Sequence, residues 1–406
     1  MKNERKQTLL PTYMKSFSCI GSACEDTCCN GWTINIDKNT FKKYKKLSTQ
    51  KIKVDIERDL KRNKKNSSDG HYAEFRLKSN GCPLQSEEGW CRIQSELGES
   101  YLSNTCSIYP RMFNEVDNVV EMGGALSCPE ITRLALFNPN GIDFDMTIQE
   151  DTSRGFRKYK IDTRIDNYKL FWDIRSFAIS ILQDRRFNVE ERLINLGMWI
   201  SKLNVVFQTN NIEKLTENIN NFKQTLNNSD LKSSLEKIKP NYDLYTKICY
   251  EILSIRKLYS IDNKRYLDLL NDISEGLKMD GETLIENFDE IISSIKVQFY
   301  NPYFKEKDYI LENYLVNDVF INCFGNNPVK IFEQYNLLVL KFALVKLHLY
   351  GVSAKYKELN DELVAYVIQS FSKCIEHNVH YPMKIVEVVK TNELNSLAHM
   401  AILIKG

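Results

Sequence analysis

Cysteine is concentrated at one end of this chain. Eight of its eleven cysteines fall within the first 128 of 406 residues, and the first four occupy only eleven positions, at Cys19, Cys24, Cys28 and Cys29. Soft thiolate ligands suit zinc and iron, and cysteines grouped in loop-like sequence are the usual ligands of structural zinc and of iron–sulfur clusters. We therefore expect a small metal-binding domain at the amino-terminal end of the chain.

Four further cysteines complete this group, each within two residues of a glycine, proline or threonine: Cys82, Cys91, Cys106 and Cys128. The charged first residues are not followed by an apolar segment, so the sequence predicts no secretory signal and a cytoplasmic location. In a reducing compartment such a pattern favours metal binding over disulfides.

Eight thiols permit one four-iron cluster with four spare cysteines, two zinc sites, or one of each, and their spacing does not choose among these. Adjacent side chains normally diverge, so Cys28 and Cys29 are expected to contribute differently. Either one faces the metal and the other lies behind it, or each serves a different site.

Overall composition excludes several classes of partner. The net charge is only +2, so no global field predicts a nucleic-acid partner. No uninterrupted apolar run reaches 18 residues, so no membrane span or membrane partner is expected. The chain also contains no Walker motif, no dinucleotide-binding glycine fingerprint and no HExxH zinc motif.

The pattern changes near residue 150. Before it lie strand-like alternations at 72–77 and 119–122, and a basic stretch at 41–65 that predicts one or two short helices. After it, apolar residues recur every three or four positions, most clearly over 170–181, 193–206 and 332–349. The predicted fold is mainly α: a small α+β cysteine-rich metal-binding domain (1–150) followed by an α-helical bundle or array (151–406).

Residues 127–130, Ser-Cys-Pro-Glu, match a capping box with proline in the first turn and predict the start of a helix. Cys128 would then lie at the positive end of the helix dipole, which favours a thiolate. The pair Gly123 and Gly124 is too short for a nucleotide fingerprint. It is expected to form a turn or bulge beside Cys128, or to bring the backbone close to a ligand.

The segment from Tyr13 to Trp32, which holds the first four cysteines, resembles the amino-terminal signature of the flagellin lysine-N-methylase family. Similar motifs follow at 81–84 (Gly-Cys-Pro-Leu), 90–98 (Trp-Cys-Arg-Ile-Gln-Ser-Glu-Leu-Gly), 105–112 (Thr-Cys-Ser-Ile-Tyr-Pro-Arg-Met) and 126–130 (Leu-Ser-Cys-Pro-Glu). They are also similar to a wider cysteine-rich family described as zinc- or iron-chelating. The resemblance covers residues 13–137 by motif and the helical remainder by length and class.

This resemblance implies methylation of lysine side chains in flagellin by S-adenosylmethionine, with an iron–sulfur cluster, expected as 4Fe–4S with zinc as the alternative. The helical domain would bind the protein substrate. The reacting lysine, whose ordinary pKa is about 10.4, must be neutral, so a base or a desolvating pocket is needed. Tyr109, Glu121 and Glu96 are the candidate catalytic residues.

Arg111, Gly123 and Gly124 are the candidate cofactor-binding residues, since a guanidinium suits a carboxylate. The cluster has three possible roles. It would stabilise a loop-rich domain, bind S-adenosylmethionine through an iron with an open coordination position, or generate a radical. Amine methylation does not need a radical. The alternative function is a non-enzymatic zinc- or iron-binding interaction protein, and a third is an electron-transfer relay.

Overall fold

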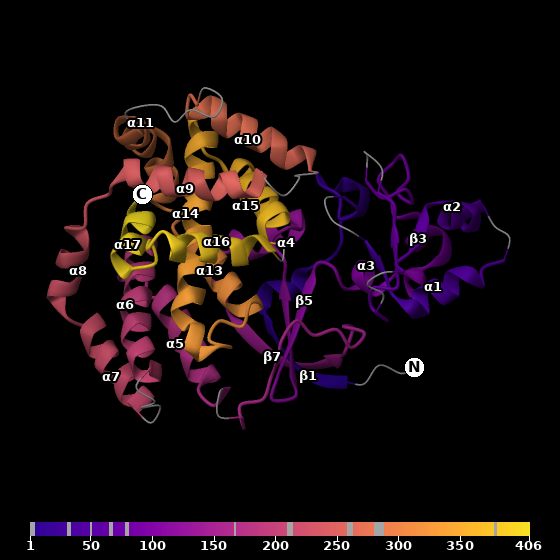
Figure 1. The fold of residues 1–406 in the computed structure, drawn as a ribbon, viewed down its shortest axis with the longest axis horizontal. Helices are drawn as coiled ribbons and strands as arrows, with labels where there is room; N and C mark the ends of the chain where they lie inside the picture. Colours follow the sequence, from indigo (N-terminus) through magenta and orange to yellow (C-terminus); the bar gives the residue numbers. More distant parts are fainter. Residues whose placement is uncertain are drawn as a thin grey trace.

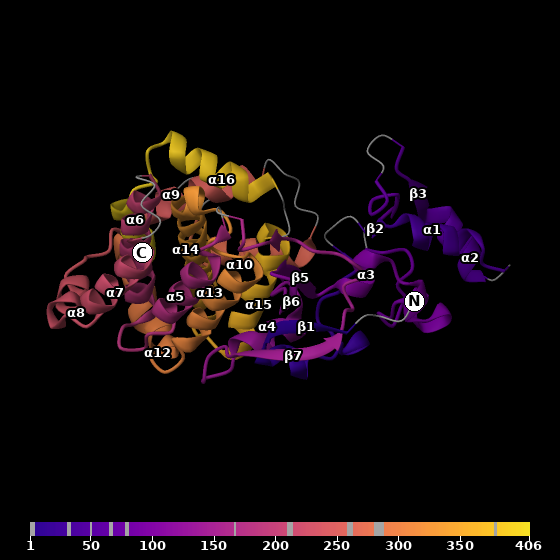
Figure 2. The ribbon, with the colours of Figure 1, turned by 90° about the horizontal axis from the view of Figure 1, so that it is seen from below.

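Two large hydrophobic cores organise the chain. The first runs from Leu10 to Ile404 and joins most of the helices, whereas the second contains only residues between Ile34 and Leu102. In Figure 1 the second core forms a lobe at one end of a helical body, and the rotated view in Figure 2 agrees. This computed structural model describes residues 5–30, 34–48, 51–64, 68–77, 81–165, 168–208, 214–257, 263–279, 288–376 and 380–406.

A five-stranded mixed sheet belongs to the helical body and has the order β7-β1-β6-β5-β8. Its strands are β1 (Arg5–Pro11), β5 (Arg111–Val116), β6 (Val119–Gly124), β7 (Phe144–Glu150) and β8 (Lys160–Ile161). β1 runs parallel to β6, with Thr8 opposite Val120, and antiparallel to β7. β5 and β6 form a tight hairpin through Asp117 and Asn118, whose positive φ angles of 50° and 68° match the twist of the strands.

The lobe is built on a three-stranded sheet of order β2-β4-β3, with β2 (Asn35–Ile36), β3 (Leu60–Arg62) and β4 (Ala73–Phe75). Its helices are α1 (Lys38–Lys45), α2 (Lys51–Asp59) and α3 (Asn104–Ile108). Tyr44 from α1 and Ile56 from α2 are buried with Phe75 of β4. We call the described part of residues 34–106 the cysteine lobe. The predicted short helices and both predicted strands are confirmed.

The remaining helices form the body, in chain order: α4 (Pro129–Leu136), α5 (Phe171–Leu182), α6 (Val189–Gln208), α7 (Leu215–Leu226), α8 (Ser229–Glu236), α9 (Tyr242–Lys257), α10 (Lys264–Gly276), α11 (Phe288–Ile295), α12 (Asn301–Phe304), α13 (Tyr309–Ile321), α14 (Ile331–Tyr356), α15 (Asp361–Phe371), α16 (His380–Thr391) and α17 (Leu397–Lys405). A π-helical turn, Ser372–Glu376, follows α15. The predicted mainly α fold with an α+β portion is confirmed.

α14 is the central helix of the body and packs against α6, α10, α15 and α17. Among the described residues it is also, with its preceding turn (Pro328–Tyr356), the one helix long and apolar enough to cross a membrane. Because 94% of its most apolar window is buried among the other helices, its composition is that of a core helix.

The hydrophobic cores divide the chain differently from its composition. Leu10 of β1, Phe113 of β5 and Val120 of β6 belong to the same core as α13 and α14, so the five-stranded sheet packs as part of the helical body. The cysteine lobe alone has a separate core. The division at residue 150 stays a prediction.

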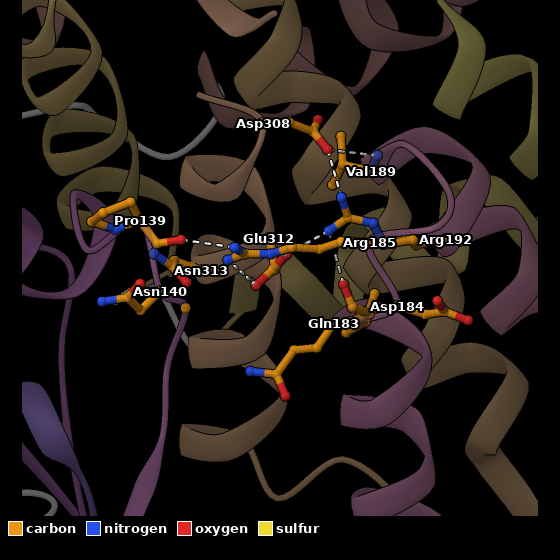
Figure 3. A network of polar contacts seen from close by, with 12 residues as sticks. Pro139, Asn140, Gln183, Asp184, Arg185, Val189, Arg192, Asp308, Glu312 and Asn313 are labelled. Atoms are coloured by element: carbon orange, nitrogen blue, oxygen red, sulfur yellow. Dashed lines mark hydrogen bonds and ion pairs between the residues drawn. The ribbon is translucent and has the colours of Figure 1, made fainter. Parts of the chain in front are cut away.

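A buried ionic network holds α6 and α13 together (Figure 3). Arg192 donates to Glu312 (2.6 Å) and to Asp308 (2.7 Å), and Arg185 binds Glu312 through two hydrogen bonds of 2.9 Å. Arg185 also donates to the carbonyl of Pro139 (2.8 Å), which ties the loop after α4 to this network. Burial raises the pKa of Asp308 to about 6, although Arg192 opposes this shift.

Replacing Arg192 by methionine should destabilise the protein strongly, because the buried Glu312 and the partly exposed Asp308 would each lose a charged partner. We expect a loss of about 3–5 kcal/mol in the free energy of unfolding, measured by urea titration. The matched control is Arg186→Met, whose side chain is 57% exposed beside Asp184 and should cost less than about 1 kcal/mol. Equal losses in the two variants would contradict a structural role for the network.

Candidate functional site

The first four cysteines lie on a loop, residues 19–30, which we call the cysteine loop. Its two adjacent cysteines point the same way, because the sulfur atoms of Cys28 and Cys29 are 3.9 Å apart. The expected divergence of these side chains is therefore wrong: the backbone turns where the Cys29 amide donates to the Thr27 hydroxyl (3.1 Å). Gly31 and Trp32, at the end of the motif, lie outside the described residues.

Five thiols gather where the cysteine loop meets the lobe: Cys28, Cys29, Cys82, Cys91 and Cys106. We call them the five-thiol group. The hydrogen bond with Cys29 and burial raise the pKa of Cys28. The hydrogen bond with Cys28 lowers the pKa of Cys29, but the neighbouring Cys82 thiol and burial outweigh it and raise this pKa overall. Burial raises the pKa of Cys106 to about 12, with Cys91 and Cys28 contributing in the same direction.

The other three cysteines of the amino-terminal region form a separate group: Cys19, Cys24 and Cys128. Burial raises the pKa of Cys128 to about 12, although backbone N–H groups of the first turn of α4 lower it, and Cys24 and Cys19 add to the rise. Burial also raises the pKa of Cys24, with Cys19 as a further contributor. The structure thus separates the eight predicted ligands into sets of five and three.

Cys128 occupies the N-cap position of α4, as predicted, but the capping box is wrong. No side chain caps this helix, and the Glu130 carboxylate instead accepts from Arg133 (2.9 Å). The Ser127 hydroxyl shares a hydrogen bond with the Tyr109 hydroxyl (3.2 Å). Ser127 thus bonds to Tyr109, and Glu130 bonds to Arg133 of the same helix, so neither side chain forms the expected box.

The donor chemistry of the five-thiol group fits a thiolate-bound metal. Among the described residues, no three Cys, His, Asp or Glu side chains are already arranged to hold a metal ion. Five neighbouring sulfurs nevertheless exceed the four ligands that a zinc ion or a four-iron cluster takes. Burial and contact with neighbouring thiols keep the pKa values of Cys28, Cys29 and Cys106 high, and a bound cation would supply the compensating charge.

The helical body binds the cysteine loop through Asp26. The Lys373 ammonium donates to both oxygens of the Asp26 carboxylate (2.8 Å each) and to the Thr27 carbonyl (2.7 Å). The Gln369 amide donates to Asp26 (2.7 Å) and to the Ser127 carbonyl (2.8 Å). We call Asp26, Gln369 and Lys373 the Asp26 clamp. The side chains of Lys373 and Asp26 are only 2% and 9% exposed.

The two clamp residues of the helical body lie near the end of α15 and in the turn that follows it. Gln369 lies in α15, and Lys373 lies in the π-helical turn that follows it. Such turns recur at functional sites because they shift the direction of side chains along a helix. The Lys373 charge also reaches Cys28, where it opposes the hydrogen bond with Cys29 and the burial that raise that pKa.

Tyr109, a predicted catalytic residue, lies between the two thiol groups. Burial raises its pKa well above the usual value, and Cys128 and Cys28 both add to this rise. Its hydroxyl therefore stays protonated at neutral pH and shares its hydrogen bond with Ser127, whose carbonyl accepts from the clamp. The structure brings Tyr109 to the site, and its catalytic role stays a prediction.

Glu121 and Glu96 lie elsewhere. The Glu121 carboxylate on β6 is fully buried and accepts two hydrogen bonds from Arg175 of α5 (2.8 and 2.5 Å), with Cys323 also in contact. Glu96 pairs with Arg92 (2.7 Å) on the surface of the lobe. These contacts describe structural ion pairs, and among the described residues none joins Glu121 to the thiol groups.

The candidate cofactor-binding residues lie in packed parts of the fold, and their role in cofactor binding stays a prediction. The guanidinium of Arg111 lies 5.3 Å from the centre of the Phe17 ring. A Cβ atom on Gly123 would lie 2.5 Å from Ile321 of α13, and one on Gly124 would lie 2.7 Å from Ile131 of α4. These glycines end β6 instead of forming the expected turn or bulge, and their lack of a side chain lets two helices approach the strand.

Sequence reasoning missed the clamp. Asp26 lies within the cysteine motif, but Lys373 is 347 residues away, and an isolated lysine in a helical pattern is normally a surface residue. The one local signal is that Lys373 and Gln369 are four residues apart, so they share a face of a helix.

The protein therefore has two parts, a thiol-rich lobe and a helical body. The cysteine loop between them is bound to the body by the Asp26 clamp and carries thiols with the donor chemistry of a metal site. The family model described as FliB lysine N-methylase C-terminal domain matches residues 175–403, more than half of the chain. The chain belongs to this family, and the resemblance to the flagellin lysine-N-methylase family is confirmed.

Three relatives show how far the similarity extends. The Lysine-N-methylase of Salmonella choleraesuis (strain SC-B67) is 25% identical over 408 residues, covering 96% of this chain and 98% of the relative. The Lysine-N-methylase of Salmonella typhimurium (strain LT2) is 24% identical with the same coverage. The Flagellar biosynthetic protein FliU of Salmonella muenchen is 40% identical over 134 residues, 32% of this chain and 78% of the relative. No solved structure matches the chain significantly.

Replacing Lys373 by methionine should release the cysteine loop, because the buried Asp26 carboxylate would lose its charged partner. We expect about 3–5 kcal/mol lower stability toward urea and a lower metal content per chain after purification without oxygen. Lys384→Met is the matched control, since Lys384 is 42% exposed and, in the part of the chain that the structure describes, pairs with Glu387 alone.

The double variant Asp26→Asn/Lys373→Met should recover part of the lost stability, because it removes both charges of the pair. Additive losses from the two substitutions would show that they do not act through a shared ion pair.

Proposed function

We propose that this protein methylates lysine side chains of flagellin, with S-adenosylmethionine as methyl donor and an iron–sulfur cluster held by the five-thiol group. Membership of the lysine N-methylase family supports lysine methylation, and the full-length relatives carry that name. The flagellar name of a third relative supports a flagellar substrate. The observation that carries the cluster is the gathering of five thiols around Cys28 and Cys29.

The proposed reaction is a displacement at carbon. The neutral lysine nitrogen attacks the methyl group, a carbon–nitrogen bond forms, and the bond between carbon and the sulfonium sulfur breaks. The sulfur leaves as a neutral thioether, and the nitrogen's proton passes to a base or to water. Because the step requires no change in oxidation state, the protein's main tasks are to orient the two reactants and to desolvate the amine.

The chain's own residues would hold the cluster. Four of Cys28, Cys29, Cys82, Cys91 and Cys106 suffice as ligands, and zinc is the alternative metal for the same donors. When bound, the cluster supplies positive charge that compensates the thiolates and ties the cysteine loop to the lobe. Asp26 and Lys373 fix the other side of this loop to the helical body. The helical body would bind flagellin, in the cytoplasm.

The first test is purification without oxygen, followed by iron, sulfide and zinc analysis and incubation with flagellin and isotope-labelled S-adenosylmethionine. We expect roughly four irons and four sulfides per chain. We also expect labelled methyl groups on flagellin lysines, located by mass spectrometry of its peptides. If the protein methylates flagellin but contains zinc and no iron, the thiols bind zinc. If the protein contains a full cluster but does not methylate flagellin, the methylase proposal is contradicted.

Cysteine variants should separate the thiol groups. The double variant Cys28→Ser/Cys106→Ser should lose most of the bound iron, because it leaves only three sulfurs in the five-thiol group and a four-iron cluster takes four. Cys249→Ser is the control: Cys249 is buried in α9 away from both groups, so this variant should keep its iron. Retention of iron by the double variant would exclude the five-thiol group as the binding site.

A further inference from the structure

A polar pocket of about 530 Å³ lies between the cysteine loop and the helical body. Asp26 and Asn30 line it from the cysteine loop, Lys264 and Asp268 from the start of α10, and Tyr366 from α15. Figure 1 shows α10 reaching from the body toward the lobe. Its volume falls in the range of about 300–1,000 Å³ that is usual for small-molecule sites.

Some of the pocket's charged groups are already used by the protein. Asp26 is bound by Lys373 and Gln369 of the clamp. Arg265, also in the lining, donates to the side-chain amide oxygen of Gln369 (3.1 Å), and its guanidinium lies 4.5 Å from the centre of the Tyr366 ring. These contacts hold one wall of the pocket in place, because Asp26 and Arg265 each have two partners there.

Two charged groups remain available to a ligand. Lys264 and Asp268 are both exposed, lie one helical turn apart on α10, and make no hydrogen bond or ion pair with another described residue. A cation and an anion on one helix face, beside an aromatic ring, suit a ligand that itself carries both charges and an aromatic group.

We propose that this pocket binds the methyl donor, an amino-acid zwitterion joined through a sulfonium to a purine nucleoside. Lys264 would bind its carboxylate, Asp268 its ammonium group, and Tyr366 would contact the purine ring. The proposal rests on the use of S-adenosylmethionine in the proposed function. It places the donor against Asp26 and Asn30, which flank Cys28 and Cys29, so the pocket and the five-thiol group share the cysteine loop.

The test measures equilibrium binding of S-adenosylmethionine and of its non-reactive product, S-adenosylhomocysteine, to the full chain purified without oxygen. Lys264→Gln, Asp268→Asn and Tyr366→Ala should each weaken binding of S-adenosylmethionine by about tenfold or more, the size expected for losing one good polar or aromatic contact. In Lys264→Gln and Asp268→Asn, iron content and the urea midpoint should not change, since Lys264 and Asp268 are exposed.

The matched controls come from another pocket, of about 240 Å³, which is lined by Glu333 and Lys390 and lies at α14 and α16. These two residues also form an ion pair (3.8 Å), so Glu333→Gln and Lys390→Gln remove the same charges without touching the proposed site. Both should bind the donor as the unmodified chain does. Ultraviolet crosslinking of the bound nucleoside should label the peptide that contains Tyr366.

The possible outcomes distinguish the pocket assignment from the methylase proposal on which it rests. Unchanged binding in all three test variants, or crosslinking to another peptide, would overturn the pocket assignment and leave the methylase proposal standing. Failure of the unmodified, metal-loaded chain to bind S-adenosylmethionine would overturn both. Competition by a flagellin lysine peptide, with no competition by S-adenosylhomocysteine, would give the pocket to the acceptor and contradict the proposal.

Discussion

The ion pair between Asp26 and Lys373 is the contact on which the arrangement of this protein depends. Each of these buried charges would cost several kcal/mol if it lost the other, so the pair strongly disfavours separation of the cysteine loop from the helical body. Gln369 extends the contact to the Ser127 carbonyl, beside Cys128. A few side chains from α15 and the turn after it therefore fix the loop that carries Cys28 relative to the start of α4.

Local patterns in the sequence predicted the parts of the structure that local physics determines. Apolar residues at helical spacing located α5, α6 and α14, and the alternation at 119–122 located β6. The predicted capping box is absent because both of its side chains bond elsewhere, Glu130 to Arg133 in the same helix and Ser127 to a residue outside it. The Ser127 hydroxyl found Tyr109 instead, so a tertiary contact replaced the expected cap.

The candidate site was predictable only in its sulfur atoms. Cysteine spacing placed eight ligands in one domain, but it could not show that they separate into sets of five and three, since this depends on how the chain returns at Cys82 and Cys106. From the sequence, Glu121 was a candidate catalytic residue that could also have a structural role. Arg175, 54 residues further along, decided for the ion pair by binding both carboxylate oxygens. Nothing local identifies such a partner.

The small size of the lobe gives its thiols a structural reason to bind metal. Its core contains only the few apolar side chains between Ile34 and Leu102, and Cys82, Cys91 and Cys106 pack against that core. Small domains with limited apolar cores are commonly completed by a metal site. A metal at the five-thiol group would join the lobe to the cysteine loop from one side while Lys373 holds the loop from the other. Because methyl transfer needs no redox step, fixing this loop beside the polar pocket is a sufficient role for the metal.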